Sequence, residues 1–186
     1  MIALTQLWIP ILLSAVLVFA ASSLIHMVLK WHNPDYRKLA NEDDVRAAIR
    51  SSSPAPGQYM FPHCIDPKEM SKPEMQQKFK EGPLGFLMLR PAGTPSMGTP
   101  LALWFVLTLI VAAAAAYLAS RTVPFGASFL AVCRVVGVVT FLAYACGGLT
   151  QAIWMGKPWN SAAKEVLDAF IYGLVSALAF GWLWPR

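Results

Sequence analysis

The sequence predicts an all-α membrane protein: a bundle of four transmembrane helices, with a long, partly structured cytoplasmic loop between helices 1 and 2. Three observations predict it: four long apolar stretches, a low content of charge, and basic residues gathered in one loop. Each apolar stretch is about long enough to cross a hydrocarbon core of roughly 30 Å as a helix. The stretches are Ile2–Leu29, Leu101–Ser120, Phe125–Met155 and Ala169–Pro185.

The composition argues against a soluble fold. Hydrophobic residues make up 56% of the 186 residues and charged residues 13%, which is less charge than an ordinary soluble domain carries. The net charge of +5 does not indicate nucleic-acid binding, because the basic residues are mixed with acids in one loop and form no basic helix face.

The first helix is predicted over residues 3–29. Pro10 is tolerated in its first turns, and Trp31 stands where an interfacial aromatic residue is expected. No Lys or Arg precedes Trp8 and the apolar run continues to Leu29, so we expect a retained helix and no cleaved signal peptide.

The polar loop, residues 30–97, is predicted to contain two short helices. Asn41 followed by Asp44 favours a helix over 42–50, and the capping box that starts at Ser71 favours another over 73–81. Asp66 is an alternative, earlier start for the second. Two β-prone runs, 58–62 and 85–90, are predicted to pair as a short ribbon.

The other three spans follow in short succession. Thr99 as N-cap with Pro100 after it predicts helix 2 over 99–120. Helix 3 is predicted over 125–154, and helix 4 over 164–184, with Asn160 or Ser161 as its cap.

The distribution of Lys and Arg predicts the orientation. The loop 30–97 holds ten of them, the connection after helix 3 two, and the connection after helix 2 and the C-terminus one each. Basic residues accumulate on the cytoplasmic side, so the long loop is expected in the cytoplasm and both termini outside.

Arg134 is the one formal charge inside a predicted span. Nine residues into helix 3, it would lie about 13 Å below the outer surface. We expect it to be held inside the bundle, because an arginine facing lipid at depth costs several kcal/mol. Two roles stay open. The functional one is a contact with an anion or headgroup, or a charge on a transport path. The structural one is an arginine that snorkels outward or bonds to carbonyls or to side chains such as Ser14, Gln6 and Thr108.

His26 and Asp168 are predicted within a turn of the cytoplasmic surface, on helices 1 and 4. With Gln151 or Tyr172 they would form a proton relay or a metal ligand set; the alternative is two interfacial residues near helix ends.

No sequence motif indicates a metal, a cofactor or catalysis. His32, His63 and Cys64 match no metal-ligand spacing. No phosphate-binding loop, HExxH or GxSxG motif occurs, so we expect no metal, no cofactor and no enzymatic activity.

Small residues at four-residue spacing predict close packing of helix 4. Gly173, Ala177 and Gly181 share one helix face, and small residues let helices approach closely in lipid. The partner is open: helix 3, or a helix of another subunit.

Three C-terminal stretches carry a resemblance. Within roughly the C-terminal fifth of the chain, three stretches resemble small uncharacterised bacterial integral membrane proteins with four helices: Gln151–Trp159, Asp168–Gly173 and Phe180–Pro185. The resemblance implies a multi-pass protein of the bacterial inner membrane and carries no activity.

We therefore expect a non-catalytic accessory or interaction subunit in the lipid bilayer. Its partner would be lipid, another membrane protein, or a second copy bound through helix 4. The alternative is a small-solute or ion transporter or channel that acts as an oligomer. A transporter is expected to show repeats or broken helices, and residues 1–120 and 121–186 show no repeat of one another.

Overall fold

The computed structural model describes residues 2–186 and divides the chain into two compact units. The helical unit comprises Met1–Tyr36 and Ser96–Arg186, and the loop unit comprises Arg37–Pro95. Each unit is described by itself.

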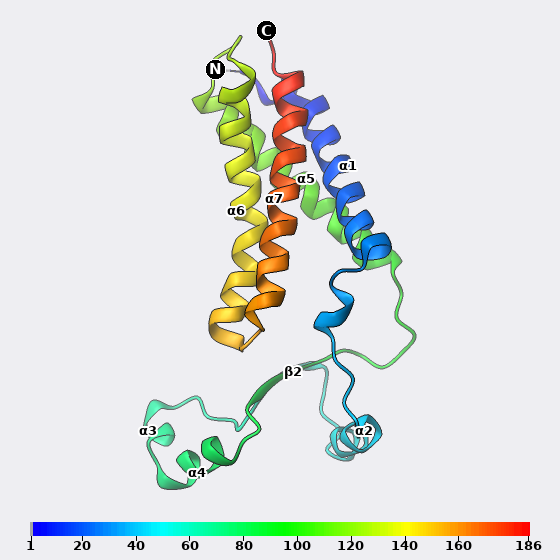
Figure 1. Cartoon of the computed structure of the whole chain (residues 1–186), viewed down its shortest axis with the longest axis vertical. Helices are drawn as coiled ribbons and strands as arrows, with labels where there is room; N and C mark the ends of the chain where they lie inside the picture. The colour runs from blue at the N-terminus through cyan, green and yellow to red at the C-terminus, as the bar shows by residue number, and fades with distance from the viewer. Residues whose placement is uncertain (1) are drawn as a thin grey trace. The chain divides into compact units, whose positions relative to one another are not determined.

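The helical unit contains four long helices (Figure 1). All four are long and apolar enough to cross a membrane, as the hydropathy of the sequence predicts. Helix α1 (Trp8–Ser23) is preceded by a 3-10 turn, Leu4–Leu7, and continues as a π-helix over Leu24–Leu29. The others are α5 (Gly98–Thr122), α6 (Phe129–Met155) and α7 (Trp159–Leu183).

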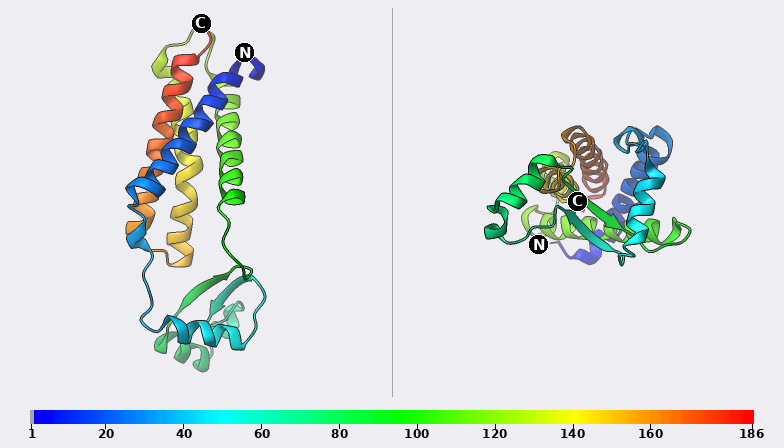
Figure 2. Two further views of the ribbon diagram at one scale, coloured as in Figure 1. Left: turned by 90° about the vertical axis from the view of Figure 1, so that its right-hand side faces the viewer. Right: turned by 90° about the horizontal axis from the view of Figure 1, so that it is seen from below.

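Helices α6 and α7 form a hairpin that packs along its whole length, and α1 packs against α7 and α5 (Figure 2). The two chain ends lie at the same end of this bundle. There the N–H of Gly126 donates to the carbonyl of Pro185 at 3.0 Å, and the N–H of Ile2 to the carbonyl of Ser120 at 3.4 Å.

The core of the bundle is mainly small and aliphatic. Phe180, Leu7, Val132 and Val136 are fully buried at the end that holds the termini, together with three alanines of α5. A second cluster nearer the other end joins Tyr172 to residues of α1, with Trp104 and Tyr144 at its edge. Most of the outward surface is apolar, as a lipid environment requires.

The loop unit is built around the predicted ribbon. Strand β1 (Gly57–Phe61) pairs antiparallel with β2 (Gly85–Leu89), in the register Tyr59 to Leu87, which confirms the predicted pairing with ends shifted by one residue. Its helices are α2 (Glu42–Ser51), α3 (Pro67–Met70) and α4 (Pro73–Glu81).

Several predicted helix starts were wrong. Helix α6 begins four residues later than expected, because Phe125–Ser128 forms a turn with Gly126 at φ +72° and Ser128 caps the helix by accepting from the N–H of Ala131. Helix α7 begins five residues earlier, directly after Pro158, whose fixed φ suits a helix start.

The predicted side-chain caps were also wrong in part. Helix α5 begins at Gly98, so Thr99 lies inside it. Neither Asn41 before α2 nor Lys72 before α4 makes a side-chain cap hydrogen bond, and Ser71 is not the cap of α4. Asp66 does cap a helix, the separate short α3, by accepting from the N–H of Lys68 at 2.9 Å.

Candidate functional site

A cluster of ionisable side chains lies at the end of the bundle away from the termini, where α1 ends and α7 begins. The π-helix after α1 ends at Leu29, and the next residue, Lys30, adopts the left-handed conformation at φ +53°. That residue turns the chain back toward the first turns of α7. A 3-10 turn, Asn33–Asp35, follows, so that His32 and Asp35 both face α7.

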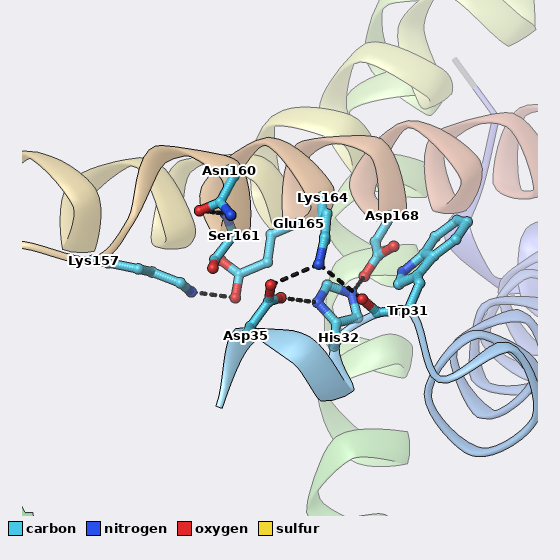
Figure 3. Close-up of polar contacts among 9 residues, drawn as sticks. All are labelled: Trp31, His32, Asp35, Lys157, Asn160, Ser161, Lys164, Glu165 and Asp168. Atoms are coloured by element: carbon cyan, nitrogen blue, oxygen red, sulfur yellow. Dashed lines mark hydrogen bonds and ion pairs between the residues drawn. The ribbon is translucent and has the colours of Figure 1, made fainter. Parts of the chain in front are cut away.

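His32 stands at the centre of the cluster between two carboxylates (Figure 3). Its Nδ1 lies 3.1 Å from Oδ2 of Asp35, and its Nε2 lies 2.8 Å from Oδ2 of Asp168. A neutral imidazole carries one N–H and one lone pair. Both hydrogen bonds can therefore form together only when the ring is doubly protonated or when one carboxyl group holds a proton.

Lys164 holds residues 31–36, the returning segment, against α7. Its Nζ donates to Oδ1 of Asp35 at 2.6 Å and to the carbonyl of Trp31 at 2.8 Å. This hydrogen bond from Lys164 is the main cause that holds the pKa of Asp35 below its ordinary value; the bond to His32 acts in the same direction, and burial opposes both. One turn away, Lys157 pairs with Glu165.

His26 lies against His32. The two imidazole rings stack, with centroids 4.8 Å apart and planes inclined by 12°. Nδ1 of His26 lies 2.9 Å from the carbonyl oxygen of Ser22. A carbonyl oxygen only accepts, so Nδ1 must be the donor, and Nε2 of a neutral His26 carries the lone pair.

Asp168 is the most buried member of the cluster, with a side chain 6% exposed. Among residues 2–186, its Oδ1 is one of three buried side-chain atoms without a hydrogen-bond partner; Trp31 Nε1 is another. A cavity of about 280 Å³ adjoins the cluster and is lined by both histidines, Asp35 and Glu165. This arrangement can hold a cation or pass a proton. The buried hydroxyl of Ser161 lines the same cavity as Asp35.

The structure brings together two of the residues predicted for this end and separates the others from it. His26 and Asp168 belong to one cluster, as predicted, but His32 stands between them. Gln151 is exposed near the end of α6. Its backbone carbonyl accepts hydrogen bonds from the N–H groups of Gly156 and Lys157. Tyr172 is buried one turn along α7 against Tyr144 and Trp104.

Sequence reasoning missed His32, Asp35 and Lys164. The signals were present but weak. His32 and Asp35 are three residues apart in a short turn, and Lys164 and Asp168 are four apart on one helix face, which makes each pair neighbours. Of the three residues whose spacing matched no metal-ligand pattern, His32 belongs to the helical unit and His63 and Cys64 belong to the loop unit.

Arg134 corrects a second expectation. Its side chain is exposed on the outside of the bundle and, within the described residues, makes no hydrogen bond or ion pair. The late start of α6 explains the difference. Arg134 is the sixth residue of the helix, about 8 Å from its end, so the long side chain can reach the membrane surface.

Arg134 also borders a groove of about 530 Å³ between α6 and α7. The groove is almost wholly apolar apart from the arginine. Its other walls are Leu130, Val138, Phe141, Phe170 and Leu174.

The small residues of α7 face α6. A methyl group added at Gly173 would lie 3.0 Å from the carbonyl oxygen of Gly137, and one added at Gly181 would lie 2.7 Å from the ring of Phe129. Cys133 donates from Sγ to the carbonyl of Ala177. The sequence left two partners open for this face of α7. In the structure the partner is α6, the predicted helix 3 of the same chain.

Compared with known protein families, with curated proteins and with solved structures, the chain matches none.

Proposed function

We propose that the chain is a non-catalytic accessory subunit of the bacterial inner membrane that binds another membrane protein through the outer face of α6 and α7. The loop unit is proposed to lie in the cytoplasm. Four apolar helices support the membrane setting, and the ten Lys and Arg residues of the long loop support the orientation.

The groove beside Arg134 is the observation that carries the proposal. It joins a large apolar surface to one exposed arginine that no described residue neutralises. In lipid, helices associate by close packing and by polar bonds between them, and such a groove offers both. A partner helix with a carboxylate at the depth of Arg134 would fill the groove and pair with the guanidinium.

The test fills the groove with a tryptophan side chain and measures whether a partner subunit still co-elutes with the protein. Val138 is 56% exposed and lines the groove, whereas Leu103 is 64% exposed on α5. The protein purified from its native membrane in mild detergent should co-elute with a defined second subunit. Val138→Trp should lose that subunit, and Leu103→Trp should keep it.

Two outcomes would contradict this function. One is a chain that elutes alone. The other is a subunit that both tryptophan variants retain. If only anionic phospholipid co-purifies, and Arg134→Leu abolishes it, the groove is a lipid site and the accessory role fails.

A polar stripe along α7 favours a second candidate, an ion or small-solute transporter. Asp168, Tyr172 and Ser176 are buried at four-residue spacing, and the hydroxyl of Ser14 donates to that of Ser176 at 2.9 Å. Polar groups at membrane depth often mark ion pathways. Beyond Ser176 the apolar cluster around Phe180 fills the bundle, so in this conformation the stripe does not cross it.

Flux measurements separate the two candidates. A transporter reconstituted in liposomes should carry protons or a cation down an imposed gradient, and Ser176→Leu should stop the flux by blocking the stripe. An accessory subunit alone should show the same leak as protein-free liposomes.

A further inference from the structure

We infer that His26, His32 and Asp168 form a site for a divalent transition-metal ion of the zinc type, at the end of the bundle where α1 meets α7. The inference does not depend on the proposed accessory role. It departs from the expectation from sequence that the chain binds no metal.

The first argument is the orientation of the two imidazoles. Metal-binding histidines almost always use one ring nitrogen for the metal and donate from the other to a carboxylate or a backbone carbonyl. His32 has a carboxylate of Asp35 at its Nδ1, and His26 has the carbonyl of Ser22 at its Nδ1. In both rings Nε2 is therefore the nitrogen left to bind a metal.

The second argument is the charge that the cluster lacks. When His32 donates from Nδ1 to Asp35, its Nε2 presents a lone pair to Asp168 at only 2.8 Å. Two lone pairs at that distance repel unless a positive charge lies between them. A proton can supply that charge, and so can a metal ion bound by both groups once the two atoms separate to about 3.4 Å.

Asp168 points to a ligand independently of the histidines. Its carboxylate is almost fully buried, yet Oδ1 has no partner. A buried polar atom of a charged group is unfavourable without one. Lys164 is engaged with Asp35 and Lys157 with Glu165, so neither lysine serves Asp168 in the hydrogen bonds of this cluster.

The chemistry of the donor set identifies the class of metal. Two imidazole nitrogens and one carboxylate suit Zn²⁺, whereas Mg²⁺ and Ca²⁺ prefer oxygen ligands alone. Three protein ligands leave a fourth position open. The cavity of about 280 Å³, which both histidines line, can hold a water molecule there.

Binding requires a small rearrangement. The ligand atoms lie within 4.8 Å of one another. With metal–ligand bonds of about 2.1 Å, ligands of a tetrahedral ion lie about 3.4 Å apart, so the widest gap must close by roughly 1.4 Å. The stacked rings must also separate, because a metal lies in the plane of each ring that binds it. His26 is exposed and belongs to a π-helical turn, so its ring can tilt away from His32 at little cost in packing.

The experiment is metal binding by the full-length protein in detergent. Zn²⁺ is titrated by calorimetry, and Co²⁺ is used as a spectroscopic substitute whose visible bands report tetrahedral coordination. The wild type should bind one ion per chain and give the tetrahedral Co²⁺ spectrum.

Four variants distinguish the three ligands from the residue that positions one of them. His26→Ala and His32→Ala should each weaken Zn²⁺ binding by at least about 100-fold, as should Asp168→Asn, because each removes a ligand. Asp35→Ala removes a positioning contact to His32 and should weaken binding by roughly 10–100-fold while the stoichiometry stays the same. His63→Ala, in the loop unit, is the matched control and should bind as the wild type does.

Circular dichroism and gel filtration of each variant exclude unfolding, and exposed His26 offers a substitution that leaves the core intact. The inference is overturned if the folded wild type binds less than one Zn²⁺ per chain. It is also overturned if His26→Ala and His32→Ala leave the affinity unchanged, or if His63→Ala lowers it as much as they do.

Discussion

The two ends of the helical bundle are closed by different interactions. At the end that holds the termini, Phe180, Leu7 and Val132 are fully buried and the alanines of α5 pack against them. At the other end, His32, Asp35 and Lys164 fasten a returning segment to α7 by hydrogen bonds and ion pairs. Close packing tolerates little change of shape, whereas a polar cluster depends on charge. Substitutions at the two ends should therefore have different consequences.

The largest expected effect concerns the side of the membrane that each end faces. With its native cysteines replaced, a chain carrying Ser52→Cys, at an exposed site in the loop unit, should resist an impermeant thiol reagent in intact spheroplasts. It should react fully after lysis, because the basic loop is proposed to lie in the cytoplasm. Labelling before lysis would place the polar end outside and reverse the proposed orientation.

Glycine substitutions compare the packing of the two ends directly. At the apolar end, Gly181→Ala would place a methyl group 2.7 Å from the ring of Phe129 and 2.9 Å from Sγ of Cys133. Overpacking of this kind should lower the free energy of unfolding by roughly 1–3 kcal/mol.

Gly148→Ala is the matched substitution near the polar end, where the atoms nearest to the added methyl group belong to the side chain of Glu165. That side chain can swing aside, and alanine favours helix over glycine by about 1 kcal/mol, so stability should hold or rise. Unfolding in mixed detergent micelles measures both variants. Equal losses would show that the two ends are packed alike.

Removing the charged side chain of Lys164 at the polar end should release residues 31–36 from α7 but leave the bundle folded. Lys164→Met deletes the donor to Asp35 and to the carbonyl of Trp31. Amide hydrogen exchange of residues 31–36 should become several-fold faster, while exchange in α5 and α6 stays slow. If the whole bundle exchanges faster, the polar end supports the global fold and the contrast between the ends is wrong.

The smallest effect is expected between the ends, at the hydrogen bond that joins Ser14 to Ser176. Such bonds between helices in a membrane contribute about 0.6 kcal/mol on average. Ser14→Ala should therefore lower stability by about that amount, and the double variant with Ser176→Ala should add little more. A loss of several kcal/mol in the double-mutant cycle would show that this bond, not the packing at the ends, determines bundle stability.

The sequence predicted the four spans because hydropathy over about 20 residues is a strong signal that needs no tertiary information. Helix ends were less predictable. Gly126 and Pro158 set two of them through local backbone geometry, and the depth of Arg134 was wrong because it was counted from a start that the helix does not use.

The candidate site was only partly predictable. His26 and Asp168 were noticed because ionisable residues near membrane depth are rare. His32 and Asp35 lie in an ordinary polar segment just after a span, and nothing local shows that they return to α7. Their meeting with Asp168 depends on the left-handed turn at Lys30, which is neither glycine nor asparagine, so no turn motif in the sequence announces it.

The returning segment also makes the chain modular. Its last anchored residue is Asp35, and the loop unit begins at Arg37. A change in the length or position of the chain at Arg37 therefore acts first on the hydrogen bonds that hold Asp35 to α7, and only then on α1. Insertions, deletions or grafted domains in that region should leave the membrane bundle intact, so the loop is free to diverge while the four helices remain a constant scaffold.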